Sequence, residues 1–163
     1  MGNEKWILTP EEAYQKYGDM IYRLAFSRVQ NKMDAEDITQ EVFMKYMRQK
    51  GKFIDEEHVK AWLLRVAINS SKSLFSSAWR RHYASLEEAI NSGIQMEEKS
   101  EVYYAVMRLP EKYRIVIQLY YYQELSVAEI SKIIGKKETT IRSQLKRARK
   151  KLQEMLKEGQ YEF

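Results

Sequence analysis

Apolar residues recur every three or four positions along most of this chain, which is the spacing that places them on one face of an α-helix. No stretch shows the strict alternation of apolar and polar residues that is typical of a half-buried strand. Only six glycines and two prolines interrupt the pattern in 163 residues. The pattern therefore predicts an all-α fold built from long amphipathic helices.

The first helix has a clear start signal. Thr9 is expected to cap it, with Pro10 in the first helical position and Glu12 reaching back to the cap. Gly18 is expected to break this helix, because glycine is unfavourable in a helix interior. A second helix follows, and its predicted buried residues are Ile21, Leu24, Ala25 and Val29.

Two more helices are predicted before residue 84. Asp34 is expected to cap the third helix, with Met33 packed on Ile38, and the helix runs to about Arg48 before Gly51. The fourth helix follows a loop and becomes basic towards its end. The predicted core positions of these two helices are Ile38, Val42, Tyr46, Val59, Trp62 or Leu63, Val66 and Leu74.

The helical pattern weakens over residues 85–100, where glutamates surround an Asn-Ser-Gly sequence. Such a composition is typical of a linker. We therefore predict two small helical domains of four helices each, residues 1–84 and 101–163, joined by a flexible linker over residues 85–100. The predicted core residues of the second domain include Val102, Val106, Leu109, Tyr113, Ile117 and Tyr120 or Tyr121.

Two helices joined by a tight turn give the most specific signal in the chain. Ser126 and Glu129 fit a capping box at the start of the first helix, and Gly135 is expected to end it. A turn over residues 136–139 leads into the second helix, where Ile141 would fill the angle between the two. This arrangement is typical of a helix-turn-helix.

The second of these helices is basic and one-sided. Residues 136–151 contain eight basic residues and one acidic residue. The apolar stripe is narrow, which suits packing on the preceding helices better than insertion into a membrane surface. Arginine and lysine pair with guanine and phosphate, and glutamine pairs with adenine, so this helix can read a DNA groove. The side chains predicted to face outward are Thr140, Arg142, Ser143, Gln144, Lys146 and Arg147.

Composition narrows the function further. The net charge of +5 is uneven, because two basic blocks flank the acidic residues 85–100, and this favours a polyanionic partner. Cysteine is absent, which excludes disulfides, thiolate metal sites and cysteine nucleophiles. No signal peptide and no apolar run of about 20 residues is visible, so we expect a cytoplasmic protein. No catalytic motif stands out, and we expect no enzyme activity, cofactor, metal or small-molecule substrate.

Four stretches in order along the chain resemble a known family. They are DAEDITQEVFMKYM (34–47), KAWLLRVAINSSKSLF (60–75), LPEKYRIVIQLYYYQELSVAEISKIIG (109–135) and TTIRSQLKRARKKL (139–152). Together they resemble bacterial RNA polymerase sigma factors of the extracytoplasmic-function group of the sigma-70 family, over about residues 11–156.

The resemblance implies a role in transcription initiation. The first domain would bind the clamp helices of the polymerase β′ subunit and open the minus-ten promoter element. The second domain would bind the minus-thirty-five element and touch the flap of the β subunit. By the same resemblance, an anti-sigma protein is expected to hold the factor inactive.

The resemblance also assigns residues to these contacts. Asp37, Gln40 and Glu41 would face the polymerase, although Asp37 can also help to cap its helix. The residues matched to the minus-ten element are Phe53, Asn69, Lys72, Ser73, Arg80 and Arg81. For Phe53, a loop residue folded onto the core is an equal alternative to a pocket for a flipped base. The promoter sequence does not carry over, because Tyr120, Gln144 and Lys146 differ from the residues of some relatives.

The sequence leaves two other functions open. A stand-alone helix-turn-helix transcriptional regulator would bind duplex operator DNA tightly without polymerase, as a dimer that uses residues 34–43. A helical adaptor with a basic amphipathic tail would instead bind protein or membrane surfaces.

Overall fold

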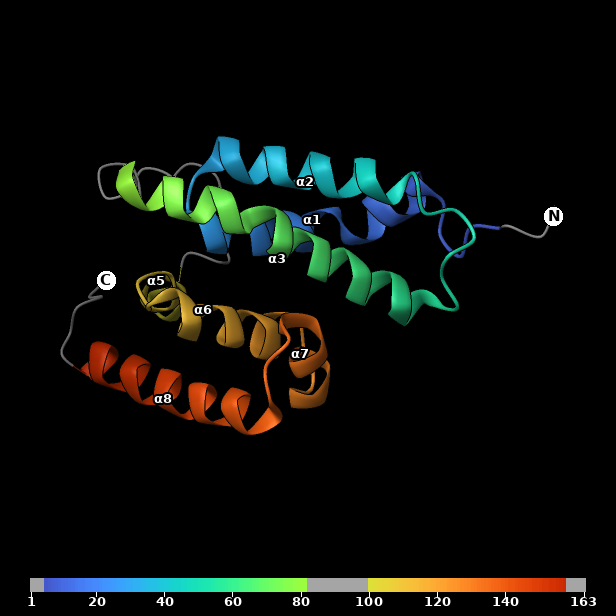
Figure 1. The fold of residues 1–163 in the computed structure, drawn as a ribbon. Helices are drawn as coiled ribbons and strands as arrows, with labels where there is room; N and C mark the ends of the chain where they lie inside the picture. The colour runs from blue at the N-terminus through green and yellow to red at the C-terminus, as the bar shows by residue number, and fades with distance from the viewer. Residues whose placement is uncertain (1–4, 82–99, 158–163) are drawn as a thin grey trace. The chain divides into compact units, whose positions relative to one another are not determined.

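The computed structural model describes residues 5–81 and 100–157, and of residues 73–81 it describes the backbone alone. The chain divides into two compact units, Met1–Ala84 and Ser85–Phe163. Every element of secondary structure in the described ranges is helical (Figure 1). The predicted all-α fold is therefore confirmed. The predicted linker lies outside the described residues, except that Ser100 is the N-cap of a helix.

Three helices make up the described part of the first unit: α1 (Pro10–Val29), α2 (Lys32–Tyr46) and α3 (Glu56–Arg81). Each packs against the other two, so the unit is a three-helix bundle (Figure 1). Val66, a predicted core position, is only half-buried, and of the two alternatives Trp62 and Leu63 it is Leu63 that is fully buried. The fully buried core includes Ile21, Leu24, Phe26, Ile38, Val42, Tyr46, Val59, Leu63 and Leu64.

α1 is one continuous helix, and the predicted break at Gly18 is wrong, so residues 5–81 form three helices in place of the predicted four. The start of α1 is as predicted: the Thr9 hydroxyl accepts from the Glu12 N–H, and the Thr9 N–H donates to the Glu12 carboxylate at 2.9 Å. Glycine inside a helix costs only about 1 kcal/mol. The packing of α1 against two other helices outweighs this cost.

α2 begins earlier than predicted, because Asn31 is its N-cap in place of Asp34. The Asn31 side-chain oxygen accepts from the Asp34 N–H at 2.9 Å. Asp34 therefore lies in the first turn, where a negative charge favours the helix. Met33 is 73% exposed, so its predicted packing on Ile38 is not observed. The helix ends at Tyr46, two residues before the predicted end.

The described part of the second unit contains α5 (Glu101–Met107), α6 (Glu111–Ile117), α7 (Val127–Ile134) and α8 (Glu138–Lys157). α6 continues directly into a π-helical turn, η2 (Gln118–Tyr122). α8 packs against α5, α6 and α7, so it is the helix that all the others support. The buried core includes Val106, Met107, Leu109, Val116, Leu119, Ile130, Ile141, Leu145 and Ala148.

Two core predictions for the second unit are wrong. Val102 is 48% exposed, and the buried apolar residue of η2 is Leu119 in place of Tyr120 or Tyr121. The π-helical turn explains the second error, because it pairs each N–H with the carbonyl five residues earlier, as Gln123 does with Gln118 at 3.1 Å. The wider turn moves the following side chains out of the expected α-helical phase.

Alanine is expected to have opposite effects at two glycines. Gly18→Ala should raise the free energy of unfolding by about 0.5–1 kcal/mol, since the backbone is helical. The added Cβ would make an ordinary contact of 3.5 Å with the Tyr14 ring. Gly135→Ala should lower the free energy of unfolding by about 1–2 kcal/mol. Its φ of 72° strains a residue with a Cβ, although nothing crowds the site.

Denaturant unfolding followed by circular dichroism measures both changes. A loss of stability in Gly18→Ala would contradict a continuous α1.

Candidate nucleic-acid interface

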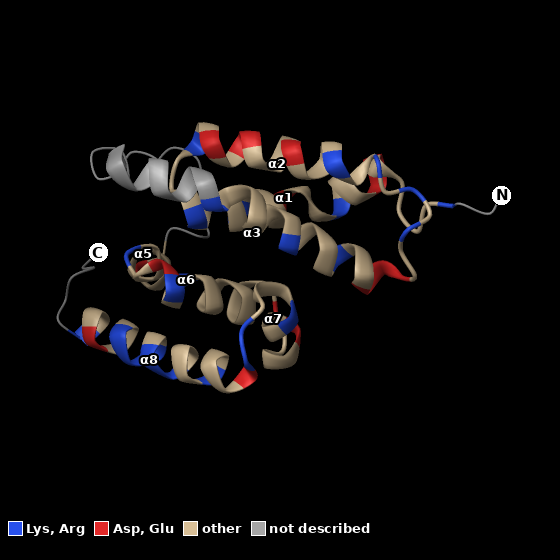
Figure 2. Cartoon of the chain, viewed as in Figure 1, with Lys and Arg blue, Asp and Glu red and all other residues tan. Residues whose placement is uncertain are grey.

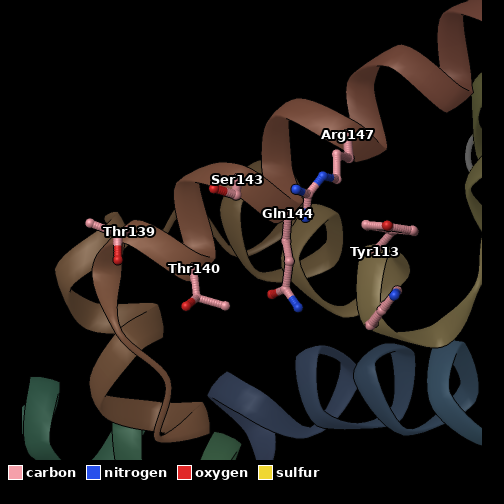
Figure 3. A pocket seen from close by; sticks show the side chains of 7 residues that line it. Tyr113, Thr139, Thr140, Ser143, Gln144 and Arg147 are labelled. Atoms are coloured by element: carbon pink, nitrogen blue, oxygen red, sulfur yellow. The ribbon is translucent and has the colours of Figure 1, made fainter.

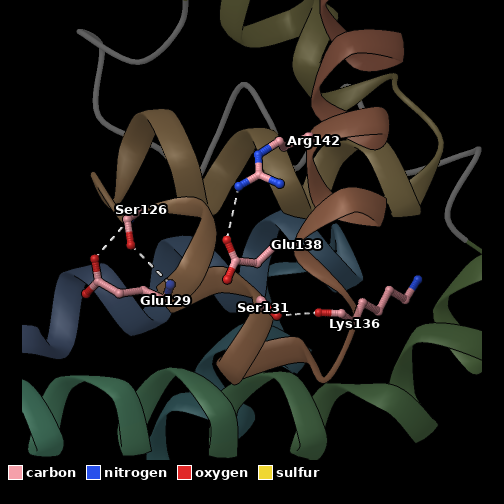
Figure 4. A network of polar contacts seen from close by, with 6 residues as sticks. All are labelled: Ser126, Glu129, Ser131, Lys136, Glu138 and Arg142. Atoms are coloured by element: carbon pink, nitrogen blue, oxygen red, sulfur yellow. Dashed lines mark hydrogen bonds and ion pairs between the residues drawn. The ribbon is translucent and has the colours of Figure 1, made fainter.

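α7 and α8 form a helix-turn-helix that three local contacts hold in shape (Figure 4). The Ser126 hydroxyl accepts from the Glu129 N–H at 3.1 Å, and the Ser126 N–H donates to the Glu129 carboxylate at 3.0 Å, which confirms the predicted capping box. Gly135 ends α7 in the left-handed conformation. The Ser131 hydroxyl donates to the Lys136 carbonyl at 2.5 Å. These contacts set the direction in which the chain enters α8.

The turn between the two helices is shorter than predicted. α8 begins at Glu138, so Glu138 and Thr139 belong to the helix, and only Lys136 and Lys137 separate it from Gly135. The short turn brings the first residues of α8 close to the end of α7, as a helix-turn-helix requires.

The apolar seam of α8, which consists of Ile141, Leu145 and Ala148, is buried in the core of the second unit. A helix that is fixed along one side must turn its other side to solvent. Lysine and arginine recur along α8 (Figure 2). The predicted outward residues that are exposed are Thr140, Arg142, Ser143, Lys146 and Arg147.

Gln144 is not exposed, and its predicted outward position is wrong. Its side chain is buried, and its Oε1 atom has no hydrogen-bond partner. The reason is that Gln144 lies beside the apolar seam, where the start of α6 covers it. Lys112 and Tyr113 of α6 line the same hollow as Gln144.

Two arginines of α8 are held by neighbouring side chains. Arg142 pairs with Glu138, one turn earlier, at 3.1 Å. Arg149 donates from Nε to the Tyr121 hydroxyl at 2.6 Å, and its guanidinium lies 5.7 and 5.6 Å from the ring centroids of Tyr120 and Tyr121. Cation–π contacts favour such a placement. Arg149 is therefore presented in a defined position, whereas a simply solvated arginine would sample many.

In the first unit, α2 exposes what we call the acidic strip. It consists of Asp37, Gln40, Glu41 and Met44. These positions follow the spacing i, i+3, i+4, i+7 and so share one face of the helix. Acidic residues recur along α2 (Figure 2). Glu41 pairs with Lys45 at 3.0 Å. Asp37 lies beyond the first turn, and Asn31 caps the helix, so capping does not explain Asp37.

α3 exposes Asn69 and Lys72, three residues apart on one face. Arg65, which the sequence analysis did not single out, is exposed one turn before Asn69 on the same face. The spacing i, i+4, i+7 is the sequence signal that would have found it. Three of the predicted minus-ten residues lie where only the backbone of α3 is described: Ser73, Arg80 and Arg81.

Phe53 lies within an aromatic cluster. Its side chain is 9% exposed, and its ring centroid is 5.3 Å from that of Tyr46, 5.7 Å from Trp62 and 5.1 Å from His58. At this exposure the Phe53 ring has little free surface on which a flipped base could stack. Of the two alternatives for Phe53, the structure favours a loop residue folded onto the core.

Comparison with known proteins matches both units. Residues 13–81 match the family Sigma-70 region 2, and residues 99–152 match Sigma-70, region 4. The chain is 32% identical over 164 residues to the ECF RNA polymerase sigma factor SigM of Bacillus subtilis (strain 168), which covers 93% of this chain and 98% of that protein. The chain belongs to the extracytoplasmic-function group of sigma-70 sigma factors.

Solved structures share the fold of this sigma factor. The sigma factor RpoE of Bartonella quintana, solved in complex with the anti-sigma factor NepR, superposes with a TM-score of 0.68 at 24% identity, over 90% of this chain and 96% of that one. CnrH, solved in complex with the cytosolic domain of CnrY, gives a TM-score of 0.69 at 22% identity, over 91% and 87% of the two chains.

Family membership decides the general function. Sigma factors bind RNA polymerase and promoters, so this chain directs transcription initiation by RNA polymerase and is not an enzyme. The regulator and adaptor alternatives are set aside, because neither accounts for a region 2 unit beside the helix-turn-helix. Across residues 5–81 and 100–157, no group of three or more His, Asp or Glu is placed to hold a metal ion. Within the same ranges, no helix is long and apolar enough to cross a membrane.

Removal of the acidic side chain at the start of α8 is expected to tighten promoter binding. The Glu138 carboxylate neutralises Arg142 and would repel phosphates. Glu138→Gln should raise the affinity of the holoenzyme for promoter DNA by about threefold to tenfold. Filter binding at fixed salt measures the change. Glu154→Gln, the same change near the other end of α8, is the control, and an equal gain in both variants would contradict a local effect.

Proposed function

We propose that the two units divide the contacts of initiation between polymerase and promoter. The observation that supports this most strongly is the opposite charge of two exposed helix faces, acidic on α2 and basic on α8 (Figure 2). Carboxylates suit a basic protein surface, whereas guanidinium and ammonium groups suit DNA phosphates. On this basis α2 binds the polymerase, and α8 binds duplex DNA at the minus-thirty-five element.

The acidic strip of α2 contacts the clamp helices of the β′ subunit. Asp37 and Glu41 supply carboxylates, and Gln40 supplies an amide that both donates and accepts. Met44 is 58% exposed in the same strip, and its flexible thioether side chain adapts to an apolar partner surface. The second unit contacts the β flap, a proposal that rests on the family resemblance alone.

The exposed face of α3 follows the unpaired strand at the minus-ten element. The Asn69 amide can pair with a base edge, and Arg65 and Lys72 on the same face can hold the flanking phosphates. Ser73, Arg80 and Arg81 continue this path by resemblance. Phe53 supports the loop before α3 from within. The exposed residues of this loop, and not Phe53, would then capture the flipped base.

α8 enters the major groove at the minus-thirty-five element. Its exposed polar residues nearest the helix start contact the DNA there, as in other helix-turn-helix proteins. They are Thr140, Arg142, Ser143, Lys146 and Arg147. Tyr120 stands where some relatives carry a phosphate-contacting arginine. Arg149, held over Tyr120 and Tyr121, supplies that cation from α8.

Regulation by an anti-sigma protein is part of the proposal. The sigma factor RpoE, which has the same fold, was solved in complex with the anti-sigma factor NepR. We extend the anti-sigma partner to this chain. An initiation factor acts where the polymerase and the chromosome lie, so we also propose a cytoplasmic location.

The acidic strip can be tested by binding to core polymerase. The double variant Asp37→Ala, Gln40→Ala is expected to weaken binding by at least about tenfold, since it removes contacts from the centre of the interface. Fluorescence anisotropy with labelled protein measures the affinity, and thermal unfolding checks the fold. Glu57→Ala, an exposed carboxylate on α3, is the control. Loss through unfolding, or equal loss in the control, would show that the two residues are not contacts.

The face of α3 can be tested by promoter opening. Arg65→Ala is expected to reduce the fraction of melted promoter by about threefold to tenfold while core binding is unchanged, because one phosphate contact is lost. Permanganate reactivity of unpaired thymines measures melting. Arg48→Ala removes an equally exposed arginine outside this face. If both variants melt the promoter equally well, Arg65 makes no such contact.

A further inference from the structure

A hollow of about 240 Å³ opens between the first half of the recognition helix α8 and the start of α6 (Figure 3). It offers two cationic groups, four hydroxyl groups and one amide, and no carboxylate lines it. Its lining residues are Lys112, Tyr113, Thr139, Thr140, Ser143, Gln144 and Arg147. A lining of this kind suits an anion with several acceptor oxygens.

The buried amide in this hollow is not explained by packing within the unit. Gln144 is 8% exposed, and its Oε1 accepts no hydrogen bond. Figure 3 shows its side chain extending from α8 between Thr140 and Tyr113. Folded proteins rarely leave a buried acceptor unpaired, because its lost contact with water is then not replaced. The unpaired oxygen leaves Gln144 able to accept a hydrogen bond from a group that enters the hollow.

Positive charge gathers at the same place. The Nζ atoms of Lys112 and Lys151 lie 5.1 and 5.7 Å from the ring centroid of Tyr113, and Arg147 lines the hollow beside them. Among the described residues, none of these three cations forms an ion pair. Arg142, on the other side of α8, is by contrast neutralised by Glu138. Lys112 and Arg147 therefore bring uncompensated positive charge to the hollow.

We propose that this hollow seats one phosphate group of the promoter backbone beside the minus-thirty-five element, and that Gln144 anchors this contact in place of reading a base. The proposal rests on the function proposed above. The Lys112 ammonium has three N–H donors, so it can donate to a phosphate oxygen and to Gln144 Oε1 together. Arg147 and the hydroxyls of Thr140 and Ser143 donate to the remaining oxygens. Phosphate binding thereby brings a donor to the unpaired acceptor.

Such a phosphate contact affects how α8 is positioned along the DNA more than which base sequence α8 prefers. A phosphate contact carries no base information but fixes how a recognition helix lies in the groove. Because Lys112 comes from α6 and Gln144 from α8, the bound phosphate would join two helices of the unit. α8 would then be held against sliding along the major groove.

The first test measures promoter binding by holoenzyme, assembled from the full chain and core polymerase, over a series of KCl concentrations. Lys112→Ala is expected to weaken binding about tenfold and to lower the log–log salt slope by about one. Gln144→Glu should weaken it by about tenfold or more, because the new carboxylate pairs with Lys112 and Arg147 and occupies the seat. Lys157→Ala removes the same charge at the far end of α8 and should have a smaller effect.

The second test separates a phosphate anchor from a base reader. Holoenzyme that carries Gln144→Ala is used to select bound promoters from a library in which the minus-thirty-five element is randomised. It is expected to bind all sequences more weakly with unchanged base preference. A preference altered at one position would show that Gln144 reads a base and would overturn the proposal.

Lys112 is exposed, so its removal does not threaten the fold. If Lys112→Ala and Lys157→Ala reduce promoter affinity equally and lower the log–log salt slope equally, the hollow holds no phosphate. A wild-type holoenzyme that bound no promoter would instead overturn the proposed function, so the two failures are distinguishable.

Discussion

The burial of Ile141, Leu145 and Ala148 is the interaction on which the promoter-binding surface depends. Each fully buried large apolar side chain contributes about 1.5–3 kcal/mol, enough to fix the rotation of α8 about its axis. Once that rotation is fixed, the charged side chains of the helix must lie on its solvent-exposed side. Without the seam, the same basic residues would form a helix that could turn any face to DNA.

The direction of α8 is set by a second constraint at its start. Gly135 adopts the left-handed conformation that L-residues avoid, and the Ser126–Glu129 capping box fixes where α7 begins. α7 thus has a defined length, and the chain reverses at a defined residue. In the first unit, the bundle core fixes the rotation of α2 about its axis. Burial of Ile38 and Val42 on one side of α2 leaves the acidic strip exposed on the other side.

Features encoded by neighbouring residues could be predicted from the sequence. Both capping boxes, the Gly135 turn and the apolar seam of α8 depend on residues within about two helical turns of each other, and all are found. Two of the features that were missed depend on packing between distant segments. Gly18 stays helical because α1 packs on two helices, and Gln144 is buried because α6 happens to cover it.

The same distinction applies to the site residues. Family motifs pointed to α2, α3 and α8, but exposure decides which side chains on those helices can touch a partner. Phe53 was assigned a contact by the resemblance and lies inside an aromatic cluster, whereas Arg65 was assigned none and lies exposed on the same face as Asn69. Lys112 has no local sequence signal, since its place in the hollow depends on how α6 crosses α8.

Run-off transcription with core polymerase over a promoter library tests the account most directly. We expect transcripts only when this protein is added, and only from templates that share both a minus-thirty-five and a minus-ten element. Altering either element on such a template should abolish its transcript. Protection of duplex DNA by the protein alone, with no transcript when core polymerase is present, would contradict the account.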